Sequence, residues 1–138
     1  MLVFGRRARG ERMAYGLIHD RWRIRTCGAL TWADSLFGEG DDLVGALRHP
    51  AALGNAGASA MLVHAGPGAA TRLELVRDLL AAANAPVKCA ATSVNGILLV
   101  RWLAEDSIDI RPGFARVWTA LRAAARDLSP TLPTFWHH

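Results

Sequence analysis

The stretch Trp22–Asp34, WRIRTCGALTWAD, alternates in character on both sides of a Cys27-Gly28 pair. A period of two is typical of a strand that buries one face, and glycine readily takes the positive φ of a tight turn. The stretch therefore predicts a β-hairpin in which Arg23 and Arg25 share one face. The opposite face, which we expect to be buried, consists of Trp22, Ile24, Leu30 and Trp32.

A second hairpin is predicted where the strand-like runs 88–93 and 96–104 flank Val94-Asn95-Gly96, because Asn-Gly is among the strongest short hairpin signals. Between the two hairpins, residues 59–64 form an apolar run that ends at a Gly-Pro-Gly sequence, which predicts a buried strand. Residues 37–57 are rich in turn formers. We expect a long irregular connection there, with only a short helical turn at 43–48.

Two segments in the second half of the chain have helical periodicity. In Ala70–Asn84, apolar residues recur at spacings of three and four, and Thr71 followed by Glu74 predicts a capping box. Ile108–Leu128 repeats the period, and Pro112 is expected in its first turn, where a missing N–H costs least. The sequence thus predicts an α+β fold, predominantly antiparallel β, with two helices in the C-terminal half that cover one side or end of the sheet.

The bulk composition predicts one folded domain, residues 1–138, because 51% of the residues are hydrophobic and 20% are charged. The net charge of +4 is spread along the chain, whereas a nucleic-acid binder gathers its charge on one face, so we expect no nucleic-acid partner. No run approaches the roughly 18 apolar residues of a membrane span, and no signal-peptide pattern is present. The sequence predicts a cytoplasmic protein without membrane contact.

Candidate reactive groups are scattered. The histidines lack metal-ligand spacing, the two cysteines form no CxxC, and no serine lies in a GxSxG sequence. Gly66–Thr71 lies between a predicted strand and a predicted helix, where an anion can bind, but it carries no lysine. These patterns predict no catalytic residues. A small anion- or nucleotide-binding enzyme domain that uses this turn is the alternative interpretation.

The segment Leu2–Asp34 also carries a longer pattern. It begins FGR at 4–6, continues with Ala8, Gly10 and Glu11, and ends with a WR strand and its return strand. This order resembles the urease accessory protein UreD (UreH) family, with its FGRxAxGE sequence. Looser likeness continues to the proline-rich tail at 133–136. The resemblance covers essentially this whole chain but only the C-terminal half of the family, so we expect the N-terminal half to be missing.

The resemblance implies a layered β stack with two helices, and a protein that is not an enzyme. It implies a chaperone that assists nickel insertion into the urease apoprotein, binding that apoprotein and UreF, which in turn recruits the GTPase UreG. No cofactor would be tightly bound, although nickel would be in transit, and the family's metal-passage residues have no assigned positions here. The matching motif residues are Gly5, Arg6, Gly10, Glu11, Asp20, Trp22 and Arg23.

We expect these motif residues to act structurally first, and as partner or nickel contacts second. Gly10 would permit a bend, and Arg6 with Glu11, or Arg23 with Asp20, would form a partly buried pair that fixes strand register, since a buried charge requires a partner. A missing half would leave strand edges exposed, which favours self-association. A misassigned start codon, a non-functional gene fragment, and a half that pairs with a separately encoded piece are the competing explanations.

Overall fold

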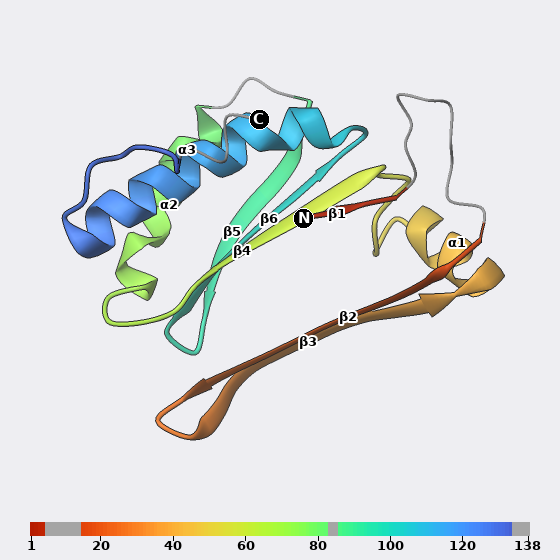
Figure 1. Ribbon diagram of the computed structural model, residues 1–138, viewed down its shortest axis with the longest axis horizontal. Helices are drawn as coiled ribbons and strands as arrows, with labels where there is room; N and C mark the ends of the chain where they lie inside the picture. Colours follow the sequence, from red (N-terminus) through yellow and green to blue (C-terminus); the bar gives the residue numbers. More distant parts are fainter. Residues whose placement is uncertain (5–14, 83–85, 134–138) are drawn as a thin grey trace.

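The computed structural model describes residues 1–4, 15–82 and 86–133 of the 138-residue chain. Its strands form a four-stranded sheet and a separate two-stranded hairpin, and helices cover one face of the sheet (Figure 1). In chain order the elements are β1 (Leu2–Val3), β2 (Leu17–Thr26), β3 (Ala29–Glu39), α1 (Gly40–Arg48), β4 (Ala58–His64), η2 (Ala70–Arg72), α2 (Leu73–Ala81), β5 (Lys88–Val94), β6 (Ile97–Ala104) and α3 (Ser107–Arg126).

The four-stranded sheet has the order β1-β4-β6-β5, and every pairing in it is antiparallel. Strand β6 is central and is the most deeply buried, because it has a neighbour on each edge and every side chain except that of Arg101 is apolar. Asn95 and Gly96 both adopt positive φ, which produces the tight turn between β5 and β6. The predicted second hairpin is therefore confirmed, as is the predicted strand at β4.

Helices α2 and α3 pack on one face of this sheet (Figure 1). Trp102 on β6 contacts Phe114 on α3, with ring centroids 5.3 Å apart. The core between the helices and the sheet is formed by Ala58, Ala60, Leu62, Val76, Leu80, Leu98, Val100, Trp102, Ala104, Ile110, Val117 and Leu121. The predicted α+β fold with two helices in the C-terminal half is confirmed.

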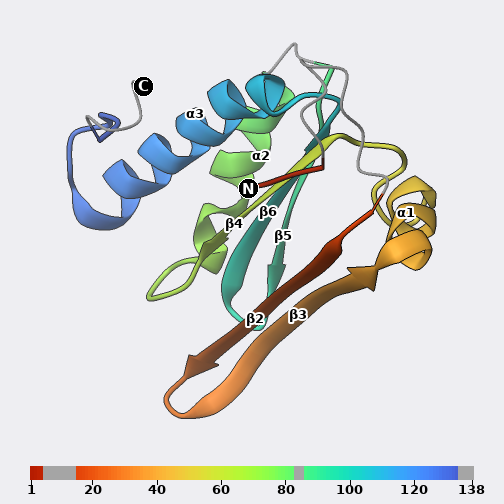
Figure 2. The ribbon, with the colours of Figure 1, turned by 45° about the vertical axis from the view of Figure 1, so that its right-hand side comes forward.

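The β2–β3 hairpin lies on the other face of the sheet, away from α2 and α3 (Figures 1 and 2). Its turn lies at Cys27-Gly28 and Gly28 adopts positive φ, as the sequence predicted, while Cys27 also adopts positive φ. The two strands are longer than the quoted stretch, since pairing continues to Leu17 and Glu39. A register shift after Ile24 marks an irregularity near the tip.

Residues 37–57 differ from the irregular connection that we predicted. Strand β3 continues to Glu39, and α1 follows it directly. The helix is amphipathic and buries Leu43 and Leu47 in a small second cluster with Phe4. The glycines and aspartates of α1 are also typical of turns, and only Leu43 and Leu47 are buried on its apolar face. The sequence pattern therefore predicted only a short helical turn there.

Two details of the predicted helices are wrong. No capping box forms, because a 3-10 turn precedes α2 and the Thr71 hydroxyl donates to the Gly68 carbonyl oxygen instead. Pro112 lies in the helix interior and not in its first turn, since α3 already begins at Ser107. Asp106 caps that helix by accepting a hydrogen bond from the Ile108 backbone N–H.

Candidate interaction surface

The inner face of the β2–β3 hairpin is tied to the sheet by polar contacts. Asp34 on β3 forms an ion pair with Arg101 on β6, at 2.6 Å, and the Asn95 side-chain amide donates to the Thr31 carbonyl oxygen at 2.8 Å. Arg101 lies on the sheet face that α2 and α3 leave uncovered. The hairpin therefore forms a second β layer over that face.

The base of the hairpin is held by the second apolar cluster. Ile18 and Leu36 on its inner face pack against this cluster, which includes Leu43 and Leu47 of α1. Gly38 is buried at the same place, and a Cβ there would lie only 2.8 Å from the Leu43 Cδ1 atom. The close approach of strand and helix explains why this position carries no side chain.

The outer face of the hairpin is exposed. We define it by the side chains that alternate with the inner ones, namely Leu17, His19, Arg21, Arg23, Ala33, Ser35, Phe37 and Glu39. Phe37 is 62% exposed and Leu17 59% exposed, and the rings of His19 and Phe37 meet edge to face at 5.6 Å. Arg21 and Arg23 follow this aromatic pair toward the tip.

The structure describes three of the seven motif residues, and it separates them between two faces. The Trp22 indole N–H donates to the Asp20 carboxylate at 3.1 Å on the inner face, whereas Arg23 lies on the outer face. The predicted Arg23–Asp20 pair is therefore wrong, because adjacent odd and even positions of a strand point to opposite sides. The motif residues outside the described part of the chain are Gly5, Arg6, Gly10 and Glu11.

The expected burial of the hairpin's apolar side chains is confirmed only in part. Ile24 and Trp32 are partly buried, but Trp22 is 37% exposed and Leu30 51% exposed. The inner face extends beyond the sheet toward the tip, so the residues there have little to cover them (Figure 2). Sequence reasoning also missed the Asp34–Arg101 pair, because the two residues are 67 positions apart.

A cleft of about 610 Å³ lies between the end of β4 and the last turns of α3. The His64 imidazole lines it, and the Nε2 atom of His64 is buried without a hydrogen-bond partner. Burial, and then the positive charge of Arg72, lower the pKa of His64 from its ordinary value of 6.5. The neutral imidazole is thus favoured at this cleft.

The Gly66–Thr71 turn beside this cleft is not arranged as an anion cradle. The Arg72 guanidinium donates to two carbonyl oxygens of the turn, those of Pro67 at 3.2 Å and Gly68 at 2.6 Å. It also donates to the Ala124 carbonyl oxygen on α3, at 3.0 Å. The Arg72 guanidinium thus links the turn to α3 through three carbonyl oxygens. We therefore assign it a structural role and not an anion-binding one.

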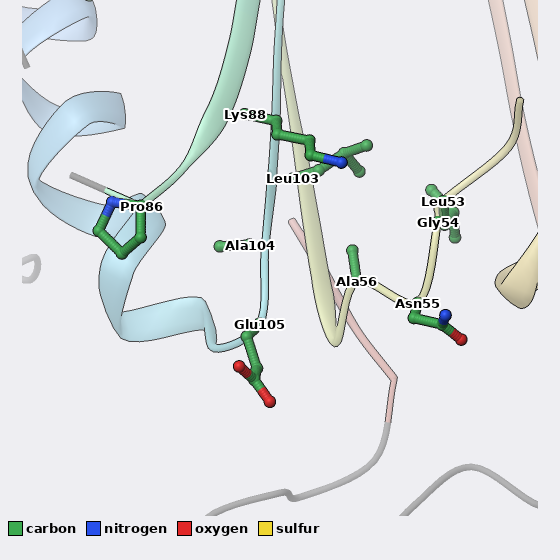
Figure 3. A pocket seen from close by; sticks show the side chains of 9 residues that line it. All are labelled: Leu53, Gly54, Asn55, Ala56, Pro86, Lys88, Leu103, Ala104 and Glu105. Atoms are coloured by element: carbon green, nitrogen blue, oxygen red, sulfur yellow. The ribbon is translucent and has the colours of Figure 1, made fainter. Parts of the chain in front are cut away.

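A second cleft of about 510 Å³ is formed by the loop after α1, the start of β5 and the end of β6. Figure 3 shows the Lys88 amine extending near Leu103, with Glu105 at the end of the strand. The wall is otherwise made mostly of small and aliphatic side chains. Lys88 and Glu105 are the charged side chains among the residues that line this cleft.

Within residues 1–4, 15–82 and 86–133, no three His, Cys, Asp or Glu side chains gather closely enough to hold a metal ion. Cys27 is exposed at the hairpin tip, while Cys89 on β5 is partly buried and burial raises the pKa of its thiol. Over the same residues, no helix is both long and apolar enough to cross a membrane. Among the described residues, the exposed apolar and arginine side chains of the hairpin's outer face form the candidate interaction site.

The family model and the individual relatives that match this chain point to the same family. The family model described as UreD urease accessory protein matches residues 1–137. A Magnetococcus marinus protein named urease accessory protein UreD is 46% identical over 125 residues, which cover 88% of this chain and 43% of that protein. Proteins of the same name from Methylobacterium sp. and Azorhizobium caulinodans are 40% and 35% identical, and the match covers 98% of this chain in each case.

This chain spans a little under half the length of these relatives, since the match covers 46% of the Methylobacterium and Azorhizobium proteins. Within that span the likeness extends from the first hairpin to the C-terminal helix and includes every element described above. A match over nearly the whole chain, with several relatives above 30% identity, establishes kinship. The chain belongs to the UreD family of urease accessory proteins.

Proposed function

We propose that this chain acts in urease maturation as an accessory scaffold that assists nickel insertion into the urease apoprotein together with UreF and UreG. The observation that carries the proposal is the UreD family match over residues 1–137. The relatives are named as accessory proteins of urease, and none of the three described above is named as an enzyme. We therefore assign this chain a role in binding proteins and not in catalysis.

The described surface supports a binding role. Large apolar side chains are exposed on the outer face of the hairpin, where Leu17 and Phe37 flank His19. Exposed apolar groups close to arginines are a common feature of protein interfaces. Nickel would pass through an assembly of these proteins without being a resident cofactor of this chain.

Co-purification tests the proposal. The tagged 138-residue chain is mixed with UreF and the urease apoprotein, singly and together, after circular dichroism has shown that the sample is folded. We expect UreF and the apoprotein to be retained, and UreG to be retained only when UreF is present. The bare tag on the same resin is the control.

A functional readout complements co-purification. The chain is expressed in cells that carry urease and its other accessory genes but lack their own UreD gene. We expect the nickel content of purified urease to rise above that of the empty-vector strain. If a well-folded sample retains neither UreF nor the apoprotein, and the nickel content of urease does not change, the chain is a fragment without this function.

A further inference from the structure

The outer face of the β2–β3 hairpin has a mainly apolar end, where Glu39 lies opposite Leu17, and a basic end nearer the tip. At the base of the hairpin, Phe37 and Leu17 are each more than half exposed, and His19 contacts the Phe37 ring. Nearer the tip, Arg21 and Arg23 lie opposite Ser35 and Ala33, which carry no charge. The two ends are continuous because residues at every second position of a strand share one face.

The two arginines have no carboxylate partner among the described residues. Among the described residues, ion pairs join Arg77 with Glu74 and Arg101 with Asp34, and both pairs lie away from the outer face. Arg23 lies on the face of the hairpin opposite to Asp20 and Asp34. An exposed guanidinium is well placed to bind a carboxylate of another molecule.

We propose that this outer face is a docking surface for an acidic protein segment. Carboxylates of the segment pair with Arg21 and Arg23, and an apolar side chain packs between Leu17 and Phe37. Charge complementarity selects the partner, because the basic end attracts acidic groups and repels basic ones. The proposal rests on the proposed function, since it assigns a surface to the protein partners named there.

The hairpin is suited to this role by the way it is held. At its base the hairpin packs through Ile18 and Leu36 against the second apolar cluster, and a partly exposed ion pair adds a contact with the sheet, so the outer face is presented on a layer that is supported mainly at its base. A supported surface loses less conformational entropy on binding than a free loop does. Even-numbered residues of β2 and β3 thus face the rest of the molecule, and odd-numbered residues form the binding face.

Charge reversal tests the surface. Retention of UreF and of the urease apoprotein is compared for the wild type, R21E/R23E and F37S. The matched control is R116E/R126E, which makes the same charge change at two exposed positions of α3. We expect R21E/R23E and F37S each to weaken the binding of at least one partner by about tenfold, a typical effect for a central interface residue. Binding by the control should stay within about twofold of the wild type.

Two further measurements make the result specific. Binding by the wild type should weaken as salt is raised, and R21K/R23K should retain part of the affinity that R21E/R23E loses, because lysine keeps the charge but not the bidentate geometry. R21Q/R23Q serves in place of the glutamate variant if that variant does not fold. Circular dichroism and the midpoint of thermal unfolding establish folding for each.

The outcomes separate this inference from the function on which it rests. If the wild type binds neither partner, the proposed function fails. If the wild type binds and the folded outer-face variants bind equally well, the docking surface is overturned while the function stands. Loss of binding on nuclease treatment, or dimerisation that R21E/R23E abolishes without affecting partner binding, would also overturn it, since a nucleic acid or a second copy would then occupy the face.

Discussion

At the scale of single residues, His64 is the side chain whose environment most constrains its chemistry. It lies at the end of β4, where its Nε2 atom is buried without a hydrogen-bond partner. Protonation would place a positive charge in this poorly solvated position, with the Arg72 guanidinium nearby. Both effects disfavour the charged imidazole, so the folded protein takes up this proton at a lower pH than the unfolded chain does.

The free energy of unfolding should therefore depend on pH through His64. Because the unfolded chain binds the proton near pH 6.5, the stability is fully present above that pH and is lost as the pH falls toward the lowered folded pKa. Chemical denaturation of the wild type between pH 7.5 and 5.5 should show this loss, and H64Q should reduce the slope. H19Q, at an exposed position, is the control, and an H64Q slope equal to that of the wild type would contradict the assignment.

At the scale of elements, the contact between β3 and α1 joins the hairpin to the rest of the molecule. Gly38 faces Leu43 so closely that an added Cβ would lie 3.1 Å from the Leu43 Cα atom and 2.8 Å from Cδ1. The Cδ1 atom can move with its side chain, but the backbone of the helix cannot. The position of α1 against the strand is thus set by the absence of a side chain at residue 38.

We expect G38A to destabilise the protein by about 1–3 kcal/mol, because a methyl group is forced into a packed contact. The matched control is G45A in α1, where an added Cβ has nothing within 4 Å. An alanine in an exposed helix interior should stabilise by about 0.5–1 kcal/mol. Denaturant titration of both variants measures the two effects, and a G38A as stable as the wild type would show that α1 shifts freely.

At the scale of the whole molecule, the described residues form two apolar clusters of unequal size. The larger lies between the four-stranded sheet and helices α2 and α3, and the smaller lies around α1 and the hairpin base. The hairpin is joined to the sheet by a partly exposed ion pair, in which the Arg101 and Asp34 side chains are 57% and 41% exposed. Such pairs typically contribute less than about 1 kcal/mol, so the two layers are coupled weakly.

Backbone hydrogen exchange should differ between the four-stranded sheet and the hairpin. Backbone N–H groups of β6 should exchange most slowly, because that strand is central and buried, whereas those of β2 and β3 toward the Cys27-Gly28 tip should exchange faster. Mass spectrometry of peptic fragments covering 97–104 and 17–30 measures the difference. Equal protection of the two fragments would contradict weak coupling of the layers.

The expected self-association stays a prediction, and light scattering on the same sample tests it. The expectation of a single domain, residues 1–138, also stays a prediction.

The two hairpins and the two helices of the C-terminal half followed from local signals in the sequence, whereas α1 did not. Asn95-Gly96 and Cys27-Gly28 gave both hairpin turns, and periodicity of three to four residues gave α2 and α3, because these patterns depend on neighbours within one element. The candidate site was predicted less completely. Arg23 was among the motif residues, but its expected partner Asp20 lies on the opposite face.

The amino-acid sequence by itself determined the family, the two hairpins and the helices of the C-terminal half. Only the tertiary structure decided which hairpin face meets the sheet, since a period of two shows that two faces exist but not which one finds a neighbour. The Asp34–Arg101 pair and the exposure of Trp22 depend on where the hairpin lies over a sheet formed by residues far along the chain. Long-range contacts of this kind leave no periodic trace, so Arg21 and Phe37 emerge as one surface only in the folded molecule.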